Sequence, residues 1–318
     1  MKLVITIDTE EDDWGGYKTT GATLRNIERI PRLQELFDKF GVRPTYLITY
    51  PVATDQKSIR ILKDINDSGR CEIGTHCHPW NTPPFKEKLN DHNSMLSNLP
   101  SDLQYEKLRI LHDTISDIFG EAPTSFRAGR WGFNSEVAIN ILKLRYSVDT
   151  SISPFINWKS EHGPDFSMAP VRAYKCGVDN ILKPNVSGVL TEVPATIGFL
   201  QSNFNLCVRI FRTTEHRAAK ALHLRGLLSR IGVLNRLWFS PEYAGSSMLC
   251  QLASNILQNN FSIINLTFHS SSLLAGITPF VRTSSDEQSF FENINSLLEF
   301  LLAKGVQSIT LSQTPEVV

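Results

Sequence analysis

Short apolar runs alternate with amphipathic segments along most of this chain, and each apolar run ends in polar residues. Leu3–Ile7 has the length and the aliphatic content of a buried strand, whereas Ser101–Phe119 carries apolar residues at helical spacing. Strands that alternate with helices form parallel sheets, because a parallel connection needs a long crossover. The sequence therefore predicts an α/β architecture whose functional residues lie at the carboxyl ends of the strands.

The expected elements follow from apolar periodicity and from the Gly and Pro residues that end or begin helices. Strands are predicted at Leu3–Ile7, Pro44–Tyr50, within Cys71–Trp80, at Thr124–Arg127, Tyr146–Asp149, Ser262–Phe268 and Val306–Leu311. Helices are predicted at Pro31–Phe40, Ser58–Ser68, Ser101–Phe119, Ser135–Leu144, about Glu242–Asn259 and Glu287–Lys304. We expect one domain that spans residues 1–318.

This alternation breaks between Ser151 and about Pro241. The stretch is rich in proline and contains one expected strand, Val189–Val193, and a basic segment, Arg209–Arg236. We interpret residues 151–241 as an irregular and helical insertion within the domain. The basic segment is expected to be an amphipathic cover over the barrel, or a contact with a partner or a membrane surface.

Charge and cysteine usage narrow the class of protein. Lys+Arg and Asp+Glu both number 32, so the formal net charge is zero and a general nucleic-acid binder is not expected. The five cysteines are scattered without a CxxC pair, which is typical of free thiols in a reducing compartment. No apolar run reaches the roughly 18 residues of a membrane span, and Leu3–Ile7 is too short for a secretory signal. We expect a cytoplasmic protein.

Polar residues gather at the predicted strand ends. A single residue separates His76 from His78, and a single residue separates Asp8 from Glu10. Because side chains alternate along a strand, each pair lies on one side of its strand. Later predicted strands end at Arg127, Asp149 and His269. If the fold is barrel-like, these residues converge.

Each of these residue types has a function in metal-assisted hydrolysis. One carboxylate and two neutral imidazoles can hold a divalent ion, zinc above all, and leave positions open for water and substrate. A second carboxylate can accept a proton from water, an arginine keeps that carboxylate ionised, and a histidine can protonate a leaving amine. The sequence has no GxGxxG or Walker A motif and no nucleophile elbow, which argues against nucleotide-binding enzymes and serine hydrolases.

Five segments, in order, resemble the motifs of the polysaccharide deacetylase superfamily (NodB-homology, carbohydrate esterase family 4-like). They are VITIDTE, EIGTHCHPW, FRAGRWGF, YSVDTS and LTFHSS, and the resemblance covers most of the chain outside Ser151–Pro241. It implies a distorted (β/α) barrel of about seven strands, a divalent metal ion, and removal of N- or O-acetyl groups from sugars.

The resemblance also implies roles for single residues. Asp8 matches the catalytic base, Arg127 the residue that supports it, and His269 the general acid. Glu10 and His76 match metal ligands. Thr9 separates the two acids, which are adjacent in most members, and Trp80 stands where the second metal-binding histidine usually lies. His78 is the nearby substitute, so the D-x-E and H-x-H motifs indicate a divergent branch.

Four further residues are expected near the substrate. Trp80 follows the two histidines in the second motif, and Arg130 and Trp131 follow Arg127 in the third; aromatic faces often stack on sugar rings. Asp149 ends a predicted strand, and a structural cap is its alternative role. Glu11, Asp12 and Asp13 are expected to form a solvated acidic loop.

Together these features predict a metal-dependent hydrolase that acts on carbon–nitrogen bonds other than peptide bonds. The expected reaction removes an acetyl or similar acyl group from an amino sugar or a polysaccharide precursor, in bacterial surface-polysaccharide metabolism. Two alternatives stay open. One is hydrolysis of another amide, as in the allantoinase-like branch of the superfamily, and the other is a catalytically silent carbohydrate-binding domain.

Overall fold

Strand β1 (Lys2–Thr9) lies inside a sheet of nine strands, between β10 (Ile263–His269) and β2 (Thr45–Ile48). In this computed structural model, which describes residues 1–214, 226, 228, 230 and 232–318, the order is β10-β1-β2-β3-β4-β5-β7-β6. β11 (Gln307–Ser308) pairs with β1 outside this path. The other strands are β3 (Glu72–Cys77), β4 (Ser125–Ala128), β5 (Val148–Asp149), β6 (Tyr174–Cys176) and β7 (Leu190–Glu192).

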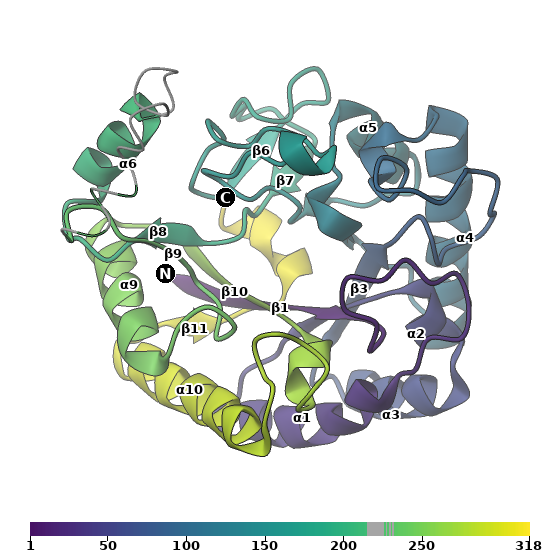
Figure 1. The fold of residues 1–318 in the computed structure, drawn as a ribbon, viewed down its shortest axis with the longest axis horizontal. Coiled ribbons are helices and arrows are strands. Elements are labelled where there is room, and N and C mark those ends of the chain that lie inside the picture. Colours follow the sequence, from purple (N-terminus) through teal and green to yellow (C-terminus); the bar gives the residue numbers. More distant parts are fainter. Residues whose placement is uncertain (215–225, 227, 229, 231) are drawn as a thin grey trace.

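The helices lie around the outside of the curved sheet (Figure 1). They are α1 (Ile30–Lys39), α2 (Tyr50–Thr54), α3 (Gln56–Asp67), α4 (Ser101–Phe119), α5 (Ser135–Lys143), α6 (Phe204–Thr213), α9 (Ser246–Gln258) and α10 (Ser284–Ala303). In the part of the chain that the structure describes, no helix combines the length and the apolar character that a membrane crossing requires.

Side-chain alternation along β1 gives the sheet two different faces. Leu3, Ile5 and Ile7 belong to the large core that includes the outer helices. Val4 belongs instead to a small apolar cluster inside the barrel, and Thr6 and Asp8 continue its row by parity. This inner cluster consists of Val4, Leu47, Val148, Val193, Ile263 and Leu311. It fills the amino-terminal end of the barrel and leaves the opposite end for polar groups.

A buried polar layer lies above the inner cluster. The side chain of Thr6 donates a hydrogen bond to Asn265 (3.0 Å), and Asn265 donates to Thr150 (3.0 Å). The guanidinium of Arg127 donates to Thr6 Oγ1 (2.6 Å) and to the carbonyl oxygen of Thr150 (3.0 Å). Strands from both ends of the chain are thus linked across the interior, directly beneath Asp8.

The segment 151–241 is more regular than the sequence predicts. β7 overlaps the strand expected at Val189–Val193 and pairs in parallel with β5, while β6 pairs antiparallel with β7. β8 (Ile197–Phe199) and β9 (Arg236–Trp238) form a separate antiparallel sheet. The expected distorted (β/α) barrel is confirmed, but its main sheet has nine strands rather than about seven. Of the basic segment 209–236, residues 215–225, 227, 229 and 231 lie outside the described residues.

Two boundaries differ in ways that matter for the site. The helix expected from about Glu242 begins at Ser246, so Glu242 lies in the preceding turn and is free to point toward β10. The last strand is only Gln307–Ser308. Leu311 instead begins a 3-10 turn, and its side chain belongs to the inner cluster.

Candidate metal centre and active site

A cavity of about 270 Å³ opens at the carboxyl ends of β1, β3, β4 and β10. Its walls come from these strand ends and from the loop that follows β1. The lining residues are Asp8, Glu10, Glu11, Asp13, Trp14, Gly15, Gly16, Tyr17, Lys18, Ala22, His76, His78, Trp80, Arg127, Ala128, Arg130, Trp131 and His269. Every site residue expected from the sequence lines it except Asp149.

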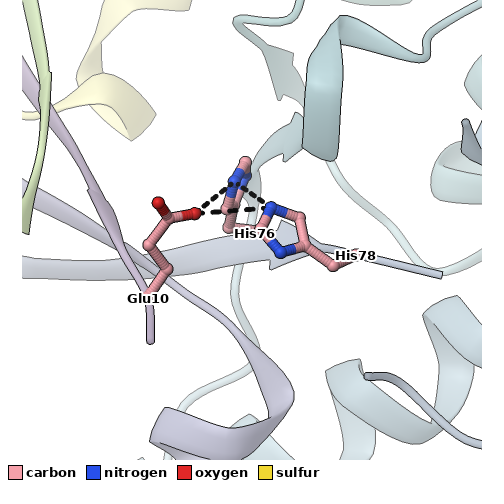
Figure 2. A group of neighbouring side chains, drawn as sticks. All are labelled: Glu10, His76 and His78. Carbon is pink, nitrogen blue, oxygen red and sulfur yellow. Dashed lines mark hydrogen bonds and ion pairs between the residues drawn. The ribbon is translucent and has the colours of Figure 1, made fainter. Parts of the chain in front are cut away.

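Glu10, His76 and His78 form a compact cluster in this cavity (Figure 2). Nε2 of His78 lies 2.9 Å from Nε2 of His76. Oε2 of Glu10 lies 3.5 Å from Nε2 of His78 and 3.7 Å from Nε2 of His76. Nδ1 of His76 lies 3.1 Å from the carbonyl oxygen of Arg127, which fixes the proton on Nδ1 and leaves a lone pair on Nε2. The three donor atoms therefore face one point.

This donor set fits a divalent cation. Nitrogen and oxygen ligands bind zinc at about 2.0–2.2 Å, and ligand atoms of one ion cannot be more than about 4 Å apart, a limit that all three separations meet. Burial lowers the pKa of His76 to about 4 and lowers that of His78, so both imidazoles are neutral. Burial raises the pKa of Glu10 to about 8; the charge of His269 opposes this shift, and the carboxylates of Asp8 and Glu11 add to it. A cation held by the three ligands would lower that pKa and favour the ionised carboxylate.

Asp8 lies beside this cluster and is held from below by Arg127. Nη1 of Arg127 donates to Oδ1 of Asp8 at 2.5 Å, and the arginine is only 1% exposed. Burial alone would raise the pKa of Asp8, but the guanidinium brings it below its usual value. The second oxygen, Oδ2, lies 3.9 Å from Nε2 of His76 and 3.7 Å from Nε2 of His269. An ionised carboxylate oxygen thus faces the cavity.

His269 lies opposite and is held by Glu242, a residue that sequence reasoning missed. Nδ1 of His269 is 3.1 Å from both carboxylate oxygens of Glu242. The same carboxylate accepts hydrogen bonds from the backbone N–H of His269 (3.0 Å) and from Ser272 (2.6 Å). Burial alone would lower the pKa of His269, but Glu242 and the cavity acids raise it to about 10. The imidazole is therefore a charged proton donor whose Nε2 points toward Asp8.

Aromatic and cationic side chains form the walls around His76 and His78. The ring of Trp80 stacks on His78, with centroids 4.2 Å apart and an interplanar angle of 26°. Arg130 and Trp131 have left-handed backbones, with φ of 53° and 60°, which non-glycine residues rarely adopt. This turn directs Arg130 toward Ser94 and Glu161 and places Trp131 5.4 Å from the guanidinium of Arg127.

Gly129 begins that turn because no side chain fits there. A Cβ atom on Gly129 would lie 2.1 Å from Cδ2 of His78 and 2.9 Å from its Nε2. The backbone just after β4 therefore lies directly against the imidazole of His78. The ring is packed between Gly129 and Trp80, and its Nδ1 is buried without a hydrogen-bond partner.

Asp149 does not line this cavity, unlike the other residues that the sequence places near the substrate. Its side chain is fully buried and accepts hydrogen bonds from the backbone N–H (3.0 Å) and hydroxyl (2.6 Å) of Ser151. Asp149 also lies directly opposite Glu192 in the β5–β7 pairing. The reason is parity: Thr150 points into the barrel toward Arg127, so the neighbouring Asp149 points away.

The prediction that Glu11 and Asp12 are solvated is also wrong. Glu11 is 7% exposed and accepts hydrogen bonds from Asn81 and from Thr49 (3.3 Å), and burial raises its pKa to about 7. Asp12 accepts hydrogen bonds from the backbone N–H (3.0 Å) and amide (2.8 Å) of Asn26. The loop after β1 is thus anchored by its acids and forms a wall of the cavity.

Comparisons with known proteins concern the fold. No protein-family model matches this sequence, and no curated protein matches it significantly. A Parabacteroides distasonis protein, provisionally classed as a glycoside hydrolase/deacetylase, has a TM-score of 0.59 at 10% identity, over 99% of this chain and 70% of that one. A Mycobacterium smegmatis protein, provisionally classed as a polysaccharide deacetylase, has a TM-score of 0.51 at 14% identity, over 98% and 93%.

A 4-alpha-glucanotransferase from Thermococcus litoralis also matches, with a TM-score of 0.50 at 8% identity, over 99% of this chain but only 38% of the larger protein. The same barrel thus occurs in proteins with different named reactions, and the reaction of this chain has to be inferred from its site. The resemblance that the sequence motifs indicate is confirmed at the level of the fold: this chain has the same distorted barrel as these two solved structures.

Proposed function

We propose that this protein is a metal-dependent hydrolase that removes an acetyl or similar acyl group from the nitrogen of an amino sugar. The observation that carries the proposal is the arrangement of two kinds of group in one buried cavity. Oδ2 of Asp8 lies between the metal-ligand cluster and a charged imidazole, 3.9 Å from His76 and 3.7 Å from His269. This is the disposition that general base, cation site and general acid require across one scissile amide.

Glu10, His76 and His78 would hold the divalent ion, for which zinc is well suited. When bound, that ion supplies Lewis-acid activation of water and of the acyl oxygen. Asp8 accepts the proton of the attacking water at Oδ2, while Arg127 holds Oδ1 and keeps the carboxylate ionised.

His269 donates its Nε2 proton to the nitrogen as the bond between carbon and nitrogen breaks. Glu242 holds the opposite side of that ring through Nδ1, so that the proton on Nε2 faces the cavity. The products are a carboxylic acid and a free amine. Trp80, Arg130 and Trp131 are the candidate substrate contacts, because they line the cavity beside the cluster.

We also propose that the protein acts in a reducing compartment such as the bacterial cytoplasm, because all five cysteines are free thiols. A polysaccharide precursor is the proposed substrate.

The test begins with metal analysis of the purified protein and of His78→Ala. About one equivalent in the parent, lost in the variant, supports the cluster as the metal site. Release of acetate is then measured with N-acetylated amino sugars, free, nucleotide-linked and in oligosaccharides.

Asp8→Asn should abolish turnover and retain the metal, because the amide cannot accept the proton of water. Asp13→Asn is the matched control, since Asp13 lines the same cavity but pairs with Lys18 at 2.8 Å. An Asp8→Asn enzyme that still turns over would remove the proposed base. A metal-loaded parent that releases no acyl group from any member of the panel would favour a silent binding domain.

A further inference from the structure

Lys107 is fully buried, which is rare for a lysine and requires that its charge be compensated. It lies on α4, and its ammonium group contacts four oxygen atoms of one segment. These are the carbonyl oxygens of Pro79 (2.9 Å), Thr82 (2.7 Å) and Pro84 (2.7 Å), and Oε1 of Glu87 (2.8 Å). The lysine is therefore wholly engaged in holding residues 79–87.

That segment needs an outside donor because its own backbone supplies few. Pro79, Pro83 and Pro84 have no N–H group. The backbone N–H of Thr82 donates to the carbonyl oxygen of His78 at 3.1 Å, and this bond spans a single turn. Buried carbonyl oxygens without donors are costly, and an ammonium group offers three N–H donors at one point. Lys107 thus replaces the hydrogen bonds that a proline-rich loop cannot make for itself.

The loop begins directly after His78, just beyond the end of β3, and reaches the cavity. Trp80 is 9% exposed and stacks on His78, and Asn81 donates a hydrogen bond to Glu11. The two metal-ligand histidines are held in different ways. His76 has a hydrogen-bond partner on Nδ1, the usual arrangement for a metal ligand, whereas Nδ1 of His78 has none. The orientation of His78 therefore depends on the packing of its ring between Trp80 and the backbone of Gly129.

From these contacts we infer that Lys107 is a positioning residue for the metal centre. It fixes residues 79–87, this loop fixes Trp80, and Trp80 holds the imidazole of His78 with Nε2 toward Glu10 and His76. The inference rests on the proposed function only in taking Glu10, His76 and His78 as the metal site. It does not depend on the reaction or on the substrate.

The test measures metal binding rather than turnover. Co²⁺ is titrated into the metal-free protein, its affinity is obtained by competition with a chelator, and its visible absorption spectrum reports the ligand set. Lys107→Met should weaken Co²⁺ binding about tenfold or more, the usual effect of removing a group that orients a ligand, and should alter the spectrum. Circular dichroism establishes that the variant is folded.

Lys86→Met is the matched control. Lys86 lies in the same loop and pairs with Glu106 of the same helix at 2.5 Å, but on the surface. Its removal should leave affinity and spectrum unchanged. Trp80→Leu should weaken binding as well, and the double variant Lys107→Met/Trp80→Leu should lose less than the two single losses combined, because both act on His78 through one path.

If Lys107→Met does not fold, Lys107→Met/Glu87→Gln removes both buried charges and serves in its place. A folded variant with the affinity and spectrum of the parent would overturn the inference, as would additive losses in the double variant. A parent that binds no Co²⁺ would instead refute the metal centre itself, and with it both proposals.

Discussion

Replacement of Gly129 by alanine tests the metal centre with a single methyl group. The added Cβ would lie 2.1 Å from Cδ2 of His78, so the ring has to move by about 1.3 Å to reach an ordinary contact of 3.4 Å. Metal–ligand distances tolerate errors of only about 0.2 Å. Gly129→Ala should therefore remove His78 from the ligand set and weaken zinc binding as strongly as His78→Ala does.

The same substitution should lower stability moderately, because the added Cβ would also lie 2.9 Å from the backbone carbonyl oxygen of Cys77. Gly129 does not have the left-handed backbone that disfavours alanine, and the His78 ring borders the cavity into which it can move. Overpacking costs about 1–3 kcal/mol, and the stiffer unfolded chain returns about 0.4–1 kcal/mol.

Zinc affinity is measured by chelator competition, and stability by urea unfolding of the metal-free protein. Gly245→Ala is the control, because its Cβ would meet nothing closer than 3.6 Å. Wild-type zinc affinity in Gly129→Ala, beside a loss in His78→Ala, would refute the packing argument.

Two further predictions concern buried acids. Glu242→Gln removes the carboxylate that raises the pKa of His269 to about 10, so the alkaline limb of the kcat profile should move to lower pH by about one unit or more. An alkaline limb that does not move would exclude Glu242 as the residue that raises the pKa of His269. In the parent, the stability contributed by the His269–Glu242 pair is complete below the ordinary histidine pKa near 6.5 and is lost as the pH rises toward 10. Burial and the nearby Asp149 raise the pKa of Glu192 well above 4.5, so the parent loses stability as the pH rises above that value. The Tm of Glu192→Gln should therefore increase relative to the parent from pH 5 to pH 9, with metal binding unchanged, and a difference in Tm that does not vary with pH would contradict this.

The sequence predicts the motif-bearing part of the fold well because local rules govern it. The expected helix Ser101–Phe119 matches α4 residue for residue. The expected apolar runs lie within β1 and β3, and the acids and histidines lie at or just after the ends of these strands. The rules fail where pairing is decided by distant segments. The strand expected at Val189–Val193 overlaps β7, but β6 was not expected: it is three residues long and pairs only with β7, which itself pairs with β5.

The candidate site shows the same division. Alternation along a strand indicates which side chains share a side, and Asp8, Glu10, His76 and His78 all line one cavity. Asp149 lies at the end of a predicted strand, as expected, but its side chain points to the opposite face of the sheet from the cavity.

Glu242 has no local signal, since it lies in a turn after β9 and reaches His269 only through the packing of that turn on β10. Burial of Glu11 likewise depends on Asn81, which lies seventy positions later.

The pairing of β1 with β10 has a consequence for biosynthesis. Glu10, His76 and His78 are all translated before residue 80, whereas His269 follows nearly two hundred residues later. At about 5–20 residues per second, the ribosome needs on the order of ten to forty seconds to cover that interval. During it, β1 can pair with β2 while the edge that β10 will occupy has no partner. A nascent chain can therefore gather its metal donors well before it gains its proton donor, and until then the edge of β1 that pairs with β10 is open to other strands.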